Sequence, residues 1–560
     1  MRKVICRLAI AAVLAVAGQS HANGGWNVAD TGQPGKEVSF RLTEGTWMSV
    51  AVSSDGRTIL FDLLGDIYSM PATGGRATLV HGGPAIERLA TFSPDGKYIL
   101  YLSDRSGADN LWISRPDGSE ARQVTREDTA MIAGPAWDPT GEYVAAVRVE
   151  ATFPRMSSSE IRIYHRDGGA GRVVVEAPAS GHDVQEPVFS PDGRYLYYTE
   201  RVVDHHIYVD ANHINYVVKR RDLATGQVDE ILGGFGSATT PQVSPDGRRI
   251  AFVRRVKDKT VLFVHDLETL RQRPVYDALD RDVHADFVQQ GTYYPKFGWF
   301  PDSRHIAVWG KGKLFRIDAE KAEAREIPFE VEARHYITDA VRVPFELAPE
   351  QLTVKAVMHL AVAPDERSFL FNALGSLWKK AGPDARPQRL TASENFEFEP
   401  AFSRDGRRIV YMEWNDERGS ILKIADADGG RAKTLVASRG IIREAAFAPD
   451  GKRIVYRIQG AQKSMAPYAA RAGIYVIDAA GGEPRRLVDD GITPQFSPDG
   501  RRIYYLRADY SDGGLVTRLE SVNLDGFDRR EHARAVGNDR PEVRVSPDLR
   551  WIAFKEYQQY

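Results

Sequence analysis

Three nearby histidines are the residues in this sequence with the clearest capacity for metal chemistry. His205, His206 and His213 stand among carboxylate and amide side chains, a mixture that binds divalent transition metals in proteins. In an extended strand, His206, Tyr208 and Asp210 would share one face and could hold a cation. The same residues also suit an enlarged hairpin whose polar side chains face solvent. We favour the hairpin and predict no metal site in this chain.

Two hydrolase signatures are missing from the sequence. An amidohydrolase-type site needs a His-x-His pair at the end of a barrel strand, with further His ligands and an Asp base, and no His-x-His occurs. An α/β hydrolase needs a Gly-x-Ser-x-Gly elbow between a strand and a helix, and that motif is absent as well. We therefore assign no catalytic residue and predict no cofactor for these 560 residues.

Charged side chains recur shortly before copies of a Ser-Pro-Asp-Gly motif. If these copies surround a central channel, the charged residues would meet at its mouth and suit a polar or peptide-like ligand, or the tail of a partner. Solvated loop ends with some ion pairs are the plainer alternative. The candidate ligand-binding residues are Glu87, Arg88, Glu186, Lys296, Glu399, Arg443, Glu444, Arg540 and Glu542.

The motif that must position these residues is an internal repeat. Its clearest copy, FSPDGKYILY at residues 92–101, recurs near residues 189, 243 and 496, and weaker copies fill the gaps. Successive copies are 40 to 63 residues apart, close to the spacing of four-stranded propeller blades. The repeated aspartates are Asp55, Asp95, Asp138, Asp192, Asp246, Asp302, Asp365, Asp405, Asp450, Asp499 and Asp548.

The chemistry of the motif predicts a structural turn. Ser, Pro and Gly at the first, second and fourth positions match the preferences of a type I turn. The β-branched and aromatic residues that follow are typical of a buried strand, so each unit has four strands joined by turns and a loop. We predict that the eleven aspartates accept hydrogen bonds from nearby backbone amides and have a structural role. The predicted fold class is all-β.

Besides the blade repeat, the sequence contains a longer duplication. Asp55 matches Asp365 and Asp95 matches Asp405, both at an offset of 310 residues. The first half holds six copies of the motif and the second half five. This pattern predicts tandem β-propellers of four-stranded blades, a six-bladed ring at 37–335 and an incomplete second ring at 336–560. We expect a truncation in the fifth blade, because an open ring leaves strand edges unpaired. One irregular ring of eleven units is the alternative.

The start of the chain predicts export. A basic beginning, an apolar stretch over residues 8–17 and a small-x-small ending at Ala22 are typical of a secretory signal peptide, residues 1–22. Residues 23–36 would form a linker. The single cysteine, Cys6, would leave with the signal peptide, which suits a periplasmic or extracellular protein. With 74 Lys and Arg against 76 Asp and Glu, we expect neither nucleic-acid binding nor a membrane span after cleavage.

The repeats resemble a known family. Copies of Ser-Pro-Asp-Gly-(Arg/Lys)-x-(Ile/Leu)-x-(Phe/Tyr), present across the mature chain, are similar to the blades of TolB-type (WD40-like) β-propellers. The segments LTEGTWM at 42–48, FDLLGDIY at 61–68 and FEFEPAFSRDG at 396–406 resemble the N-terminal propeller region of exported amidohydrolase-family proteins. That resemblance implies a metal-dependent amidohydrolase domain beyond Tyr560, which would hold a divalent, zinc-like metal. No residue of this chain takes over a metal-binding role from it.

These observations together predict an exported, non-catalytic propeller region that gates or recruits substrate for a following amidohydrolase domain, its principal partner. A stand-alone periplasmic protein-binding propeller of the Tol-system type, which would meet an envelope protein through its channel face, is the alternative. A propeller that serves a peptidase is less favoured, because the serine elbow is absent.

Overall fold

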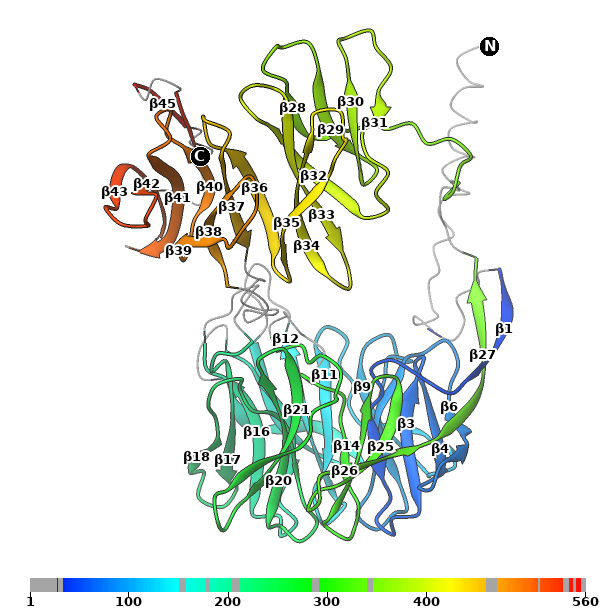
Figure 1. Cartoon of the computed structure of the whole chain (residues 1–560). Helices are drawn as coiled ribbons and strands as arrows, with labels where there is room; N and C mark the ends of the chain where they lie inside the picture. Colours follow the sequence, from blue (N-terminus) through cyan, green and yellow to red (C-terminus); the bar gives the residue numbers. More distant parts are fainter. Residues whose placement is uncertain are drawn as a thin grey trace, which may run out of the picture. The chain divides into compact units, whose positions relative to one another are not determined.

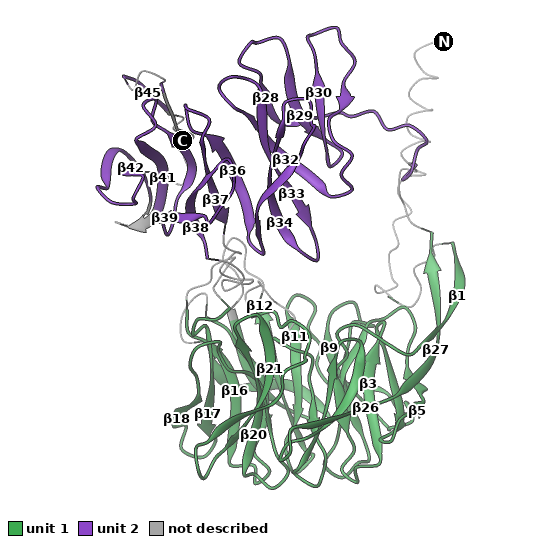
Figure 2. Ribbon diagram, viewed as in Figure 1, with its two compact units in different colours: residues 1–343 green, residues 344–560 purple. Residues whose placement is uncertain are grey.

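The computed structural model of the chain is built from β-strands. It describes residues 28, 34–150, 158–177, 182–203, 211–284, 292–339, 346–459, 471–511, 514–536, 543–546 and 550–554. The strands divide into two compact units, residues 1–343 and 344–560, which Figure 2 shows in green and purple. Within the described ranges we find no helical segment with the length and apolar character of a membrane span.

Unit 1 contains six four-stranded antiparallel sheets, which we call blades 1 to 6. Blades 1 to 3 consist of β2 (Val50–Val52), β3 (Thr58–Leu63), β4 (Asp66–Pro71) and β6 (Thr78–His81); β7 (Glu87–Phe92), β8 (Ile99–Ser103), β9 (Asn110–Ser114) and β10 (Arg122–Gln123); and β11 (Met131–Trp137), β12 (Tyr143–Glu150), β13 (Ser158–His165) and β14 (Gly168–Glu176). Blades 4 to 6 consist of β15 (Val184–Phe189), β16 (Tyr195–Arg201), β17 (Tyr216–Asp222) and β18 (Val228–Leu232); β19 (Thr239–Val243), β20 (Arg249–Val256), β21 (Lys259–Asp266) and β22 (Gln272–Tyr276); and β23 (Gly298–Trp299), β24 (His305–Gly310), β25 (Lys313–Asp318) and β26 (Glu323–Ile327).

The six blades close into a ring. The first strands of successive blades contact one another in order, and β2 of blade 1 also contacts β23 of blade 6. The core lies between blades: Leu60 and Ile67 of blade 1, for example, pack with Ile99 and Tyr101 of blade 2. Second strands such as β8 are therefore buried on both faces, as their continuous apolar sequence predicts. The all-β propeller fold expected from the repeats is confirmed.

A separate three-stranded sheet joins the two ends of unit 1. β1 (Gly35–Leu42) pairs antiparallel with β27 (Phe329–Thr338) along eight residue pairs, and β27 also pairs with the short parallel strand β5 (Gly75–Arg76). The β1–β27 ribbon is visible at the right of Figure 1. The predicted bounds of the first ring, residues 37 and 335, fall inside β1 and β27. This ribbon links the beginning of unit 1 to its end. It therefore adds a second connection between the chain ends, besides the contact of blade 1 with blade 6.

The Ser-Pro-Asp-Gly motif forms the turn between the first two strands of a blade. In blade 2 the Ser93 hydroxyl donates to the Asp95 carboxylate (2.8 Å) and accepts the backbone N–H of Tyr98 (2.9 Å). The N–H of Gly96 donates to the Ser93 carbonyl, and its φ of +69° is one that glycine adopts without strain. Asp95 also accepts the backbone N–H two residues later, from Lys97. The same backbone bond is made by Asp55, Asp138, Asp192, Asp246, Asp302, Asp365, Asp405, Asp450 and Asp499, whereas Asp548 lies outside the described residues.

The turns of neighbouring blades also pack against one another. A Cβ on Gly141 would lie 3.6 Å from Cδ of Pro94 in the preceding blade, and a Cβ on Gly193 would lie 3.8 Å from Pro139. The last contact of the ring is the one between blades 1 and 6, where a Cβ on Gly56 would lie 3.1 Å from Pro301. Glycine suits this position because the turn needs a positive φ, and at Gly56 the neighbouring proline also leaves little room for a side chain.

Unit 2 repeats the same blade architecture. Its four-stranded sheets, blades 7 to 10, consist of β28 (Met358–Val362), β29 (Phe369–Ala373), β30 (Ser376–Lys380) and β31 (Gln388–Arg389); β32 (Phe396–Phe402), β33 (Arg408–Asn415), β34 (Gly419–Asp426) and β35 (Lys433–Ser438); β36 (Ile441–Phe447), β37 (Arg453–Gln459), β38 (Gly473–Asp478) and β39 (Arg485–Val488); and β40 (Ile492–Phe496), β41 (Arg502–Ser511), β42 (Gly514–Asn523) and β43 (Arg530–Val536). β44 (Val543–Val545) and β45 (Ile552–Phe554) form a further antiparallel pair. The predicted boundary at 335/336 compares with an observed division at 343/344.

Candidate functional site

A β-bulge interrupts the first strand of most blades, where the strand lines the centre of the ring. The residue six positions before the turn aspartate, which we call the bulge residue, has a left-handed φ between 47° and 58° in seven blades. For a residue with a side chain this conformation costs about 1–2 kcal/mol, so the surroundings must hold it. The seven bulge residues are Leu89, Glu186, Thr240, His359, Glu399, Glu444 and Thr493.

Carboxylates hold four of these bulges in place, those at Leu89, Thr240, Glu444 and Thr493. The left-handed conformation turns the backbone N–H toward the preceding blade, where a glutamate accepts it. Glu186 accepts the N–H of Thr240, and Glu444 accepts the N–H of Thr493, both at 2.6 Å. Glu399 likewise accepts the N–H of Glu444 at 2.6 Å. The predicted binding residues Glu186, Glu399 and Glu444 are therefore parts of one repeated arrangement that connects neighbouring blades.

In blade 1 the carboxylate that accepts the N–H of the next bulge residue comes from an aspartate on the second strand. Asp62 on β3 accepts the backbone N–H of Ser49 (2.7 Å) and of the bulge residue Leu89 (2.8 Å). Burial raises the pKa of Asp62 to about 6, although both N–H groups and the nearby Arg88 favour the charged form. Sequence reasoning missed Asp62, because an aspartate in the middle of a strand carries no spacing signal.

Glu186 and Lys296 line a small cavity of about 20 Å³ near the centre of unit 1. The buried Glu186 carboxylate also accepts the hydroxyls of Thr199 (2.7 Å) and Thr292 (3.0 Å) and the backbone N–H of Tyr293 (2.8 Å). Burial raises its pKa, and these donors oppose the rise. Lys296 stands at the bulge position of blade 6, and its ammonium group donates to the carbonyl of Pro135 in blade 3 at 2.6 Å. Burial lowers the pKa of Lys296 to about 8.

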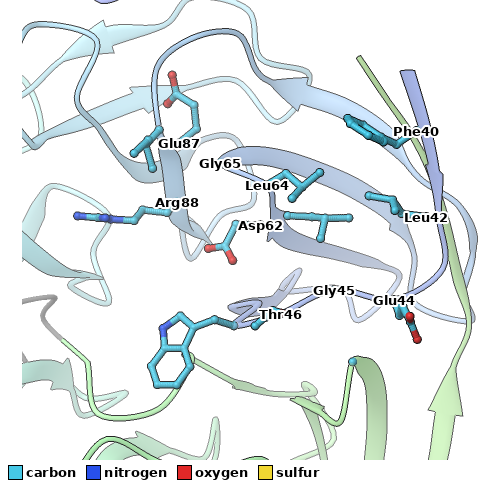
Figure 3. Close-up of a pocket in the computed structure, with 14 residues that line it drawn as sticks. Phe40, Leu42, Glu44, Gly45, Thr46, Asp62, Leu64, Gly65, Glu87 and Arg88 are labelled. Carbon is cyan, nitrogen blue, oxygen red and sulfur yellow. The ribbon is translucent and has the colours of Figure 1, made fainter. Parts of the chain in front are cut away.

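The opposite side of the ring holds an open pocket with a volume of about 810 Å³ (Figure 3). It lies between β1, the chain before β2, the β3–β4 turn and the start of β7. Figure 3 shows Leu42 and Leu64 on one side of it and Arg88 extending away on the other. The lining residues are Phe40, Leu42, Glu44, Gly45, Thr46, Trp47, Asp62, Leu63, Leu64, Gly65, Ile86, Glu87, Arg88 and Gly312.

The predicted pair Glu87 and Arg88 reaches this pocket, but both charges are already balanced. The buried Glu87 carboxylate accepts the guanidinium of Arg105 at 2.5 Å, and Arg88 forms a 2.8 Å ion pair with Asp109. Burial raises the pKa of Glu87, and Arg105 opposes the rise. Figure 3 shows the Glu87 carboxylate pointing away from Asp62. Glu44 is exposed and has no cationic partner within the described part of the chain. Asp62 is buried and both of its oxygens are hydrogen-bonded, so Glu44 is the exposed negative charge of the pocket lining.

Unit 2 has a smaller open pocket of about 340 Å³ at its own bulge residues. Arg443 donates to Glu399 at 2.5 Å, and Arg457 pairs with Glu444 at 3.0 Å. The ring nitrogen of His359 lies 3.9 Å from Glu399, while burial lowers the pKa of the imidazole. The structure therefore brings the predicted residues Glu399, Arg443 and Glu444 together and adds His359, a bulge residue that the spacing from Asp365 would have revealed.

Several sequence predictions fall on residues that the structure does not describe. His205, His206, Arg540 and Glu542 lie outside the described residues. His213 is described: its exposed ring contacts Phe235 edge to face, with the ring centroids 6.2 Å apart. The favoured hairpin and the alternative cation site at these histidines are therefore both left untested.

Four-stranded blades with repeated turns and a carboxylate-linked centre define this chain as a β-propeller protein. A family model described as the TolB beta propeller domain (PD40) matches residues 35–210 and 382–559. The chain belongs to that family.

The similar sequences and structures align with only part of this chain or match it at low identity. An uncharacterized protein of Agrobacterium fabrum, Atu1656, is 30% identical over 149 residues, which are 25% of this chain and 50% of the relative. A tricorn protease homolog of Saccharolobus solfataricus is 32% identical over 113 residues, 20% of this chain and 10% of the relative. This chain thus spans half or less of the length of these relatives. The crystal structure of the tricorn protease aligns with a TM-score of 0.39 and 14% identity, covering 91% of this chain and 46% of that one. The crystal structure of TolB from Acinetobacter baumannii aligns with a TM-score of 0.25 and 13% identity, covering 69% of this chain and 78% of that one.

Proposed function

We propose that this chain is an exported binding propeller whose pocket beside blade 1 receives a polar, peptide-like ligand and delivers it to a metal-dependent amidohydrolase domain of the same protein. The observation that carries the proposal is the pocket of about 810 Å³, which combines apolar walls with the exposed carboxylate of Glu44. Ligand pockets combine an apolar lining with a few polar groups in this way. The closed ring supplies a rigid frame around it.

A binding experiment tests the pocket. The purified chain is incubated with a random hexapeptide pool, and retained peptides are identified by mass spectrometry after gel filtration. Thr46 is exposed and lines the pocket, so Thr46→Trp should fill the pocket and abolish retention. Thr43→Trp, at another exposed threonine three residues earlier, is the matched control and should retain the same peptides as the parent chain. Equal retention by both variants would contradict the proposal.

The amidohydrolase role and the export rest on sequence features. The segments at 42–48, 61–68 and 396–406 support the family resemblance, and the first 22 residues support export. The reading frame that follows the codon for Tyr560 tests the first: it should encode further propeller sequence and then a His-x-His motif. N-terminal sequencing of the protein from a periplasmic fraction tests the second, and should begin at Asn23. A chain recovered from the cytoplasm with Met1 intact would refute the export.

A second candidate function is delivery of peptides to a peptidase. The tricorn protease homolog that matches over 113 residues favours it. The same downstream reading frame separates the two candidates, because an α/β hydrolase peptidase would show Gly-x-Ser-x-Gly where the amidohydrolase would show His-x-His. Both candidates require the pocket to bind a ligand that carries amide groups.

A further inference from the structure

Unit 1 displays a leucine in a conformation that leucine disfavours. Leu64 and Gly65 form the two-residue turn between β3 and β4, with φ values of 55° and 83°. Asn, Asp and Gly are the residues that such turns prefer. Leu64 is nevertheless 56% exposed, so packing against the core does not explain its presence. The equivalent turn of blade 6 has Lys311 at the same position, with φ 47°, which shows that the turn accepts a polar residue.

A second exposed apolar side chain stands beside this turn. Ile86, immediately before β7, is 48% exposed. The backbone N–H of Glu87 donates to the carbonyl of Gly65 at 2.7 Å, and this bond places Ile86 against the turn. A Cβ on Gly65 would lie 3.8 Å from the Cα of Ile86. Leu64 and Ile86 both line the pocket beside blade 1, where they form part of its rim.

Unit 2 repeats the pair at an offset of 310 residues. Leu374 has φ 51° and is 62% exposed, and Phe396 is 49% exposed. The N–H of Glu397 donates to the carbonyl of Gly375 at 2.9 Å, the same bond as in unit 1. Two units thus keep an exposed apolar pair around a leucine that is unfavourable for the turn. Phe396 also packs on Phe398, with the ring centroids 5.8 Å apart, whereas the exposed leucine that the turn disfavours recurs in both units without such a contact being needed for the turn. Binding is a role that accounts for both copies of the leucine.

We propose that the pairs Leu64–Ile86 and Leu374–Phe396 are two copies of one docking element, each of which binds an apolar side chain of an extended peptide, and that the first copy prefers a peptide with basic flanking groups. The charge of the surroundings selects this occupant. Beside the first pair, the exposed Glu44 carboxylate has no cationic partner among the described residues, whereas Arg88, the cation of the pocket lining, is paired with Asp109. An anionic peptide would be repelled there, and a cationic one attracted. This inference deepens the proposed function by naming its ligand class and adding a second site.

Isothermal titration calorimetry of the full chain tests the inference. The probe is a hexapeptide with one leucine flanked by two lysines, and matched peptides carry two serines or two glutamates instead. We expect two binding sites per chain and, at the site that Leu64→Asn weakens, the affinity order Lys, then Ser, then Glu. Binding of only one peptide per chain, or tighter binding of the glutamate peptide, would overturn the proposal.

Substitution by asparagine removes the apolar side chain and suits the turn. Leu64→Asn and Leu374→Asn should each weaken one site about tenfold, the usual effect of losing one buried leucine contact, and leave the other site unchanged. Lys311→Asn, in the same kind of turn, is the matched control and should change neither site. Thermal melting should show that both leucine variants fold, because asparagine is the better residue for this turn.

Further outcomes distinguish this inference from the proposed function. If Thr46→Trp abolishes peptide binding while Leu64→Asn has no effect, the pocket binds a ligand but the docking element is wrong. If the parent chain binds none of the peptides, both proposals fail. If Leu64→Asn converts a dimer into a monomer in sedimentation velocity and no peptide competes, the occupant is a second copy of the chain, and the peptide proposal is overturned.

Discussion

Replacing Lys296 by methionine should remove a pH-dependent contribution to the stability of unit 1. Burial lowers the pKa of the Lys296 ammonium group from 10.5 to about 8. Between these two values the unfolded chain binds a proton that the folded chain does not, so the free energy of unfolding rises with pH. The slope is about 1.4 kcal/mol per pH unit, and the total gain between pH 8 and 10.5 is about 3 kcal/mol. Methionine cannot titrate, so the variant loses this rise.

The assay must report on unit 1 alone. Pulse proteolysis in urea at several values between pH 7 and 10, with mass-spectrometric quantification of peptides from each unit, separates the two. Unit 2 of the same molecule is the internal reference, and ionisation of tyrosines cancels between parent and variant. Lys97→Met, at an exposed lysine, is the matched control and should keep the parental slope. Equal slopes for the parent chain and Lys296→Met would refute the assignment of a partly buried, titrating ammonium group near the centre of the ring.

Three further predictions follow from the same structure. Glu186→Gln should destabilise unit 1 by about 3 kcal/mol in urea unfolding, because it breaks a buried hydrogen-bond network shared by three blades; a loss below about 1 kcal/mol would contradict that role. Asp62 has a pKa raised to about 6, so its ionisation lowers stability as pH rises from about 4 to 6. Asp62→Asn should abolish that decline when urea unfolding of unit 1 is measured between pH 4 and 7. An unchanged pH profile would count against the raised pKa of Asp62. Gly193→Val should lower the thermal midpoint, because φ +71° costs a β-branched residue about 1–2 kcal/mol; an unchanged midpoint would be incompatible with the turn geometry.

The blade repeat was predictable because its chemistry is local. The Asp95 turn closes through bonds to residues two to five positions away, so the same short motif forms it in every blade. The spacing to the preceding strand is equally regular, and this regularity led sequence reasoning to Glu186, Glu399 and Glu444. Their partners were not predictable in the same way, because the N–H groups that they accept belong to the next blade.

Contacts across the ring leave no signal in the neighbouring sequence. Lys296 and Pro135 are 161 residues apart and meet only because blades 6 and 3 face the same centre. β1 and β27 pair along eight residues, although neither contains a repeat motif. Asp62 has the sequence context of a strand residue, and only the approach of Leu89 shows that it anchors a bulge. Nonlocal pairing of this kind is decided by how whole blades pack.

The sequence by itself determined the all-β class, the blade period, the turn structure and the duplication of the chain, because hydrogen bonds and side-chain alternation over a few residues suffice for each. The tertiary structure decided which charges are balanced, which are buried and where an open pocket remains. It turned Glu186 and Lys296 from expected channel-mouth residues into the lining of a small cavity near the centre of unit 1, and it left Leu64 and Leu374 exposed. The physical reason is that burial and electrostatic balance depend on neighbours supplied by distant parts of the chain.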